Sequence, residues 1–130
     1  MKKSIAILTA LLMATLLSAC GTLQGGPANT LPTRTADGTL VGPTGKTLYT
    51  YKKDGKNTGA SECYEQCAVN WPPAAAREGE ATNKDFTQII RMDGSRQWTF
   101  KGQPLYYYAK DAKAGDKLGD GVGGNWSVAK

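Results

Sequence analysis

The chain has 130 residues, with 16 Lys or Arg, 11 Asp or Glu and a formal net charge of +5. Its basic residues are scattered rather than clustered, which argues against a nucleic-acid partner. Histidine is absent. That absence excludes His-based acid–base catalysis, Ser-His-Asp and Cys-His nucleophiles, and most zinc or haem ligation. We therefore expect a protein that is not an enzyme and that holds no metal or cofactor.

The chain begins with a targeting segment. Lys2 and Lys3 precede an apolar run over residues 5–17, which is too short and too early for a membrane-spanning helix. The run ends in a Leu-Ser-Ala-Cys sequence that closes on Cys20, as in a bacterial lipobox. We predict a signal peptide over residues 1–19 and a lipid on Cys20, which anchors the protein to a membrane without spanning it. The alternative is an ordinary secretory signal whose cleavage site happens to precede a cysteine.

A lipidated Cys20 leaves an even number of cysteines, since Cys63 and Cys67 are the only others. Gly21, rather than Asp, follows Cys20. In a Gram-negative host this favours passage to the outer membrane, facing the periplasm or the surface. The Gly-, Pro- and Thr-rich stretch up to residue 35 has the composition of a flexible tether. We therefore expect one small domain over residues 36–130.

An internal repeat divides that domain into two parts, at about residues 37–73 and 93–130. Each part contains an Asp-Gly turn, then Leu-Tyr-x-Tyr-x-x-Asp, then Asn-Trp. The matched residues are Tyr49, Tyr51, Asp54 and Trp71 in the first part, and Tyr106, Tyr108, Asp111 and Trp126 in the second. Two similar β units, each too small to bury a core alone, are expected to pack with approximate two-fold symmetry.

Alternation of apolar and polar residues predicts strands at residues 48–51, 86–91, 98–100, 105–108 and 126–129. The one helix expected covers residues 61–69, with Ser61 as its N-cap. Pro72 and Pro73 prevent it from continuing. The fold class is thus mainly β, with two pseudo-symmetric units and one short helix that carries the cysteines.

Cys63 and Cys67 lie on one face of that helix, with Cα atoms about 6 Å apart, which fits a disulfide. This structural bridge is the leading interpretation. The alternative is redox or copper handling, since paired thiols hold Cu(I). Met92 would then have to replace the missing histidine ligand, although a lone Met is more often part of a core.

The repeated tyrosines allow two interpretations. Tyr49, Tyr51, Tyr106 and Tyr108, with Trp71 and Trp126, are either the aromatic core of a small domain or a surface that stacks on sugars or another envelope polymer. Asp54 and Asp111 are expected to end their strands and accept turn hydrogen bonds. Repeat symmetry explains why they match, so we assign them no catalytic role.

With these motifs the chain resembles the predicted bacterial lipoproteins that share a Y-x-[FWY]-x-x-D motif, the secreted repeat of unknown function. The resemblance includes the Tyr and Asp residues of both motifs, the Cys pair and the Trp-Pro-Pro sequence that ends at Pro73. It implies a cell-envelope protein and no established activity. The second repeat lacks a cysteine pair. We expect a membrane-anchored lipoprotein with a binding or structural role, whose partner is the membrane itself and an envelope protein or polymer.

Overall fold

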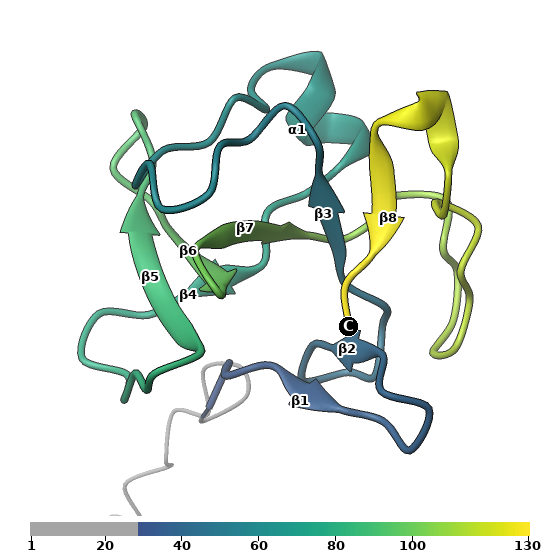
Figure 1. The fold of residues 1–130 in the computed structure, drawn as a ribbon, viewed down its shortest axis with the longest axis horizontal. Coiled ribbons are helices and arrows are strands. Elements are labelled where there is room, and N and C mark those ends of the chain that lie inside the picture. Colours follow the sequence, from purple (N-terminus) through teal and green to yellow (C-terminus); the bar gives the residue numbers. More distant parts are fainter. Residues whose placement is uncertain (1–28) are drawn as a thin grey trace, which may run out of the picture.

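The computed structural model describes residues 29–130 (Figure 1). The predicted signal peptide, Cys20 and most of the tether lie outside these residues, and their assignments remain predictions. Within residues 29–130, no helix has the length and apolar character needed to cross a membrane.

The described chain is mainly β, as predicted. A six-stranded sheet runs in the order β4-β6-β7-β3-β8, with β5 paired to β6, and β1 pairs with β2 in a separate two-stranded sheet. All of these strand pairs are antiparallel. The elements are β1 (Thr33–Arg34), β2 (Leu40–Val41), β3 (Tyr49–Tyr51), α1 (Gln66–Asn70), β4 (Ala75–Ala76), β5 (Phe86–Ile90), β6 (Arg96–Phe100), β7 (Gln103–Tyr106), the 3-10 helix η1 (Val122–Gly124) and β8 (Trp126–Val128).

Two tight turns fix the register of the central strands. Residues 91–95 connect β5 to β6, and Gly94 within them has a φ of 85°. Lys101 and Gly102 connect β6 to β7 with φ values of 48° and 79°. Two successive positive φ angles are those of a type I′ hairpin turn, whose twist matches that of the strands beside it. The Asp-Gly and Gly turns of the sequence are therefore hairpin turns in the structure.

The predicted tether is too long at its C-terminal end. Trp98 donates from Nε1 to the hydroxyl of Thr30 at 2.9 Å, and Pro32 is buried. β1 then pairs with β2. Residues 30–35 belong to the fold because they cover the edge of a core that contains Trp98. Their Thr and Pro content resembles that of a linker, so composition alone does not separate them from the tether.

Strand alternation divides the interior into two clusters. Leu48 and Leu105 point into an aliphatic core together with Leu40, Trp98 and Phe100. The residues that follow the two leucines, Tyr49 and Tyr106, point to the opposite side. There they form an aromatic cluster with Trp71, Trp126 and the disulfide. The period-two pattern in the sequence predicted this separation of Leu from Tyr.

The two repeats exchange strands rather than forming two separate units. Tyr49 of β3 lies opposite Tyr106 of β7. The Trp126 strand, β8, pairs with β3 of the first repeat. Correspondingly, the segment that leads to Ala74 runs beside the second repeat, where Ala74 donates its N–H to the Leu105 carbonyl at 2.9 Å. Each tryptophan segment thus lies against the tyrosine strand of the other repeat. Figure 1 shows one of these two contacts, with β8 beside β3.

The predicted disulfide-bearing helix exists but is shorter than expected. α1 begins at Gln66, and Glu65 before it has a φ of 52°. Ser61 is not its N-cap, because the Ser61 hydroxyl accepts hydrogen bonds from Arg91 and from the backbone N–H of Cys63. Cys63 therefore lies in an irregular segment before the helix, and only Cys67 lies within it.

Candidate functional site

The repeated motif forms two hydrogen bonds that cross between the repeats. The hydroxyl of Tyr49 donates to Asp111 at 2.6 Å, and the hydroxyl of Tyr106 donates to Asp54 at 2.5 Å. All four residues are at most 4 % exposed. Burial and the adjacent carboxylate raise the pKa of both tyrosines, so the phenols remain protonated donors. Each motif therefore supplies a donor to, and an acceptor for, the other.

The remaining bonds of the two pairs also match. Asp54 accepts the backbone N–H of Glu62 at 2.7 Å, and Asp111 accepts that of Leu118 at 3.0 Å. These bonds reach eight and seven residues along the chain, so they are not the local turn hydrogen bonds that we expected from the two aspartates. The tyrosine partners were not foreseen, because a repeat does not reveal whether its members bond within one copy or between copies.

The aromatic rings form one continuous stack through the same region. Trp71 and Trp126 lie face to face with centroids 3.7 Å apart and an interplanar angle of 4°. Tyr51 stacks on the Trp126 side at 4.3 Å, and Tyr108 stacks on the Trp71 side at 4.2 Å. The stack thus alternates between residues of the first and the second repeat.

The tyrosines are therefore packed inside the protein rather than laid out as a surface. Tyr49 and Tyr106 have no exposed area, whereas Tyr51 and Tyr108 are half-buried. In the motif, the first tyrosine supplies the hydroxyl bond and the second extends the stack. Only the second tyrosine of each motif is accessible to a ligand.

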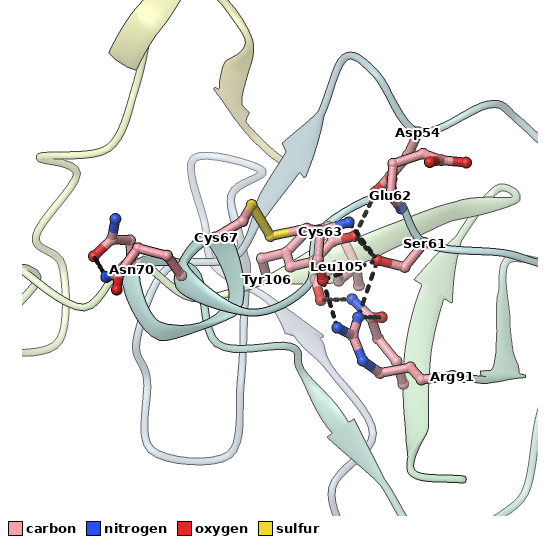
Figure 2. The surroundings of a disulfide bond; sticks show 11 residues. Asp54, Ser61, Glu62, Cys63, Cys67, Asn70, Arg91, Leu105 and Tyr106 are labelled. Carbon is pink, nitrogen blue, oxygen red and sulfur yellow. Dashed lines mark hydrogen bonds between the residues drawn. A yellow bond between two sulfur atoms is a disulfide. The ribbon is translucent and has the colours of Figure 1, made fainter. Parts of the chain in front are cut away.

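Arg91 breaks the symmetry of the site. Its side chain is 4 % exposed and donates to the Ser61 hydroxyl at 3.0 Å, to Gln97 at 2.7 Å and to the Cys63 carbonyl at 2.5 Å. Figure 2 shows the guanidinium reaching under the segment that bears the disulfide. The guanidinium also lies 4.4 Å from the ring centroid of Tyr64. No equivalent cation contacts the Asp111 pair among residues 29–130.

A hydrogen-bonded chain connects Arg91 to Asp54. The Ser61 hydroxyl lies 2.7 Å from the Tyr106 hydroxyl. Because Tyr106 donates to Asp54 and Ser61 accepts from Arg91, the proton between the two hydroxyls comes from Ser61. These hydrogen bonds thus connect a buried cation, Arg91, to a buried carboxylate, Asp54. Burial raises the pKa of Asp54, while the Tyr106 and Glu62 hydrogen bonds and the charge of Arg91 oppose that rise.

The predicted disulfide between Cys63 and Cys67 is present, with Cα atoms 5.3 Å apart. Cys63 is fully buried and packs in the aromatic cluster, while Cys67 packs at its margin. Among the described residues, no three His, Cys, Asp or Glu side chains gather as a metal ligand set. Met92 is 84 % exposed and lies beyond the end of β5. Copper or redox handling through the two thiols would require the bridge to open.

One apolar groove lies beside the stack. It has a volume of about 570 Å³, and its lining includes Pro43, Lys46, Pro72, Pro73, Tyr107 and Tyr108. We refer to it as the proline–tyrosine groove. Tyr108 contributes to it, whereas Tyr51, the matching residue of the first repeat, does not. The groove is therefore formed at one end of the ring stack only.

A family comparison accounts for the repeat. A family described as a secreted repeat of unknown function matches residues 33–75 and again residues 87–130. The chain belongs to this family. The two matched segments of the secreted repeat contain both Tyr–Asp motifs together with Trp71 and Trp126. The first segment begins at β1, in agreement with the earlier start of the fold. No curated protein and no solved structure matches the chain.

Sequence reasoning missed Arg91, Ser61 and the groove. Arg91 is one of the scattered basic residues and ends the strand predicted at residues 86–91, and no pattern around it signals that its side chain is buried. Ser61 was assigned to a helix cap. The groove is lined by residues that lie between positions 30 and 109 of the sequence and come together only in the fold.

Proposed function

We propose that the protein is a lipid-anchored envelope protein that acts by binding or as a structural component, not by catalysis. The observation that supports this most is the state of the four motif residues. Tyr49 with Asp111 and Tyr106 with Asp54 are buried and bonded to each other. Carboxylates that are committed in this way are not free to act as a general acid or base on a substrate.

We infer that the Tyr and Asp residues shared by the two repeats hold the two copies together. A binding partner would meet the molecule elsewhere, at the proline–tyrosine groove or along a strand edge. The membrane anchor is proposed on Cys20 and the preceding apolar run. The family is described as secreted, and a disulfide persists in an oxidising compartment outside the cytoplasm, so both agree with this proposal.

The anchor is tested by labelling cells with an alkyne fatty acid and isolating the protein. The wild-type chain should take up the label and fractionate with membranes. A Cys20→Ser chain should lose the label. A soluble, unlabelled wild-type protein would refute the anchor, and membrane fractions separated by density would test the outer-membrane assignment.

A second candidate function is binding of a carbohydrate or another envelope polymer at the proline–tyrosine groove. The exposed part of Tyr108 and the adjacent Lys46 favour it, because sugars stack on aromatic rings and anionic polymers attract a cation. Tyr51 provides a matched control, since it ends the same stack but does not line the groove.

The experiment uses a glycan array and isolated envelope polymers with the wild-type, Tyr108→Leu and Tyr51→Leu proteins. Both substitutions shorten the stack, so the two variant proteins should lose similar amounts of stability. Only Tyr108→Leu should abolish binding. Absence of hits, or equal losses in both variants, would refute binding at the groove.

A further inference from the structure

The outer edge of β5 is an unprotected edge of the main sheet. β5 pairs with β6 on one side only. Arg91 donates its N–H to the Ser95 carbonyl at 2.7 Å, and Lys101 donates to the Asp85 carbonyl at 2.7 Å. Antiparallel strands bond at every second residue, so the odd-numbered residues of β5 face β6. The backbone groups of Phe86, Gln88 and Ile90 therefore point away from the sheet.

Two of these three residues remain unpaired. Phe86 is covered, because its carbonyl accepts the Asn83 N–H at 2.9 Å and its N–H donates to the Asn83 side chain at 2.8 Å. The N–H and carbonyl groups of Gln88 and Ile90 make no hydrogen bond within residues 29–130. Such a row of free donors and acceptors is a template for another strand.

The opposite edge of the sheet is closed. Asp120 accepts the N–H of Val128 at 3.0 Å, and the Trp126 carbonyl accepts the N–H of Gly121 at 2.8 Å. The loop before β8 thus covers the backbone of that edge strand. β5 has no comparable cover, and in Figure 1 it forms the outer margin of the molecule.

The side chains of β5 also lack the usual protection of an edge. Its five residues, Phe86–Ile90, carry no charge and no proline. Ile90 is 60 % exposed, and Met92, just beyond the strand, is 84 % exposed. An uncharged strand meets no like-charge repulsion when it pairs with an identical strand. The free groups of Gln88 and Ile90 also lie symmetrically about Ile89.

We propose that β5 pairs with β5 of a second copy of this chain, antiparallel and centred on Ile89. In this register Gln88 of one copy exchanges hydrogen bonds with Ile90 of the other, and every free backbone group of the edge is satisfied. Ile89 faces Ile89 of the second copy in a non-hydrogen-bonded pair, where side chains come closest.

Pairing through so short a strand buries less area than a stable interface needs, so the dimer is weak in dilute solution. Its population therefore depends on local concentration. The proposed membrane anchor would confine the copies to one surface and raise that concentration. The strand register does not depend on the anchor.

The test is cross-linking of the full chain in the envelope of bacterial cells. Cysteines opposite one another in a non-hydrogen-bonded pair are close enough for a disulfide. Ile89→Cys should give a covalent dimer under mild oxidation. Thr87→Cys, on the same face but more exposed, lies opposite residue 91 of the second copy and should give severalfold less.

Two further variants separate pairing from chance collision. Adding Ile90→Pro or Ile90→Lys to Ile89→Cys should remove most of the dimer, since neither change breaks a hydrogen bond of the fold. Protease resistance of each variant confirms folding. Equal dimer from Ile89→Cys and Thr87→Cys, insensitivity to both Ile90 changes, or cross-links to a different protein would overturn the proposal.

The wild-type chain is run in parallel to keep the two proposals apart. Cys63 and Cys67 are bonded to each other. A dimer formed by the wild type would reveal a free Cys20 thiol, which would count against the lipid anchor. The β5 register would then be tested by repeating the cross-linking in chains that also carry Cys20→Ser.

Discussion

The exchange of hydrogen bonds between the repeats can be measured by double-mutant cycles. Tyr106→Phe removes a buried hydroxyl that lies 2.5 Å from the Asp54 carboxylate and 2.7 Å from Ser61. A hydrogen bond to a charged group contributes about 1.5–3 kcal/mol. We therefore expect Tyr106→Phe to lower the free energy of unfolding by about 2 kcal/mol, and Tyr49→Phe by a similar amount.

The cycle identifies the partner of each tyrosine. Combining Tyr106→Phe with Asp54→Asn should give a coupling energy of about 1–2 kcal/mol, because both changes remove the same bond. Tyr49→Phe with Asp111→Asn should behave alike. The within-repeat combination, Tyr49→Phe with Asp54→Asn, should be additive within about 0.5 kcal/mol.

Unfolding in urea, followed by tryptophan fluorescence, gives each free energy. For a domain of this size, about 2 kcal/mol corresponds to a Tm lower by about 8–12 °C, so thermal melts provide a second reading. Coupling found within the repeats, or absent between them, would refute the exchanged pairing.

Three further predictions concern the ring stack, the disulfide and Asp54. Gly119→Ala should destabilise the protein by about 1–3 kcal/mol, because a Cβ there would lie 2.8 Å from the Trp71 ring and 3.0 Å from Tyr108. Gly55→Ala, whose nearest neighbour is the Thr58 side chain, is the control in the same urea assay. Equal losses of unfolding free energy in the two variants would contradict the packing around Gly119. Replacing both Cys63 and Cys67 by Ala should lower the free energy of unfolding by about 2 kcal/mol, the effect of so short a closed loop. Mass spectrometry before and after reductant, with and without Cu(I), tests whether the two thiols handle copper. Copper uptake by the reduced protein would favour metal handling. The pKa of Asp54 is raised above its ordinary value of 3.8, so this group's contribution to stability is full at low pH and declines as pH rises from about 4 through the raised pKa. The difference in unfolding free energy between wild type and Asp54→Asn should therefore narrow over that range. A difference that widens would show that the pKa is lowered instead.

Local patterns in the sequence predicted the parts of the fold that depend on local rules. Period-two alternation placed Leu48 and Tyr49 on opposite faces, and the structure separates them into two clusters. The four-residue spacing predicted the Cys63–Cys67 bridge, which is present. The repeat predicted approximate symmetry, and the family match confirms two copies.

Features that depend on distant contacts were not predictable in the same way. The helix began later than its pattern indicated because Ser61 is held by Arg91, which is 30 residues away in the sequence. A serine has the same capping propensity wherever it occurs, so only the tertiary partner decides its role. Likewise, Tyr49 could bond to Asp54 or to Asp111 by sequence, and the strand exchange selects Asp111.

The exchanged pairing also affects when the chain can fold. Tyr49 must find Asp111 across 62 residues, and Asp54 must find Tyr106 across 52. A chain that has emerged only through its first repeat has no partner for either residue, and Trp71 has no ring from the second repeat on which to stack. Such long-range contacts make folding slow. For a precursor with the signal peptide that we predict over residues 1–19, this delay would keep the first half from reaching its final state before the second half arrives.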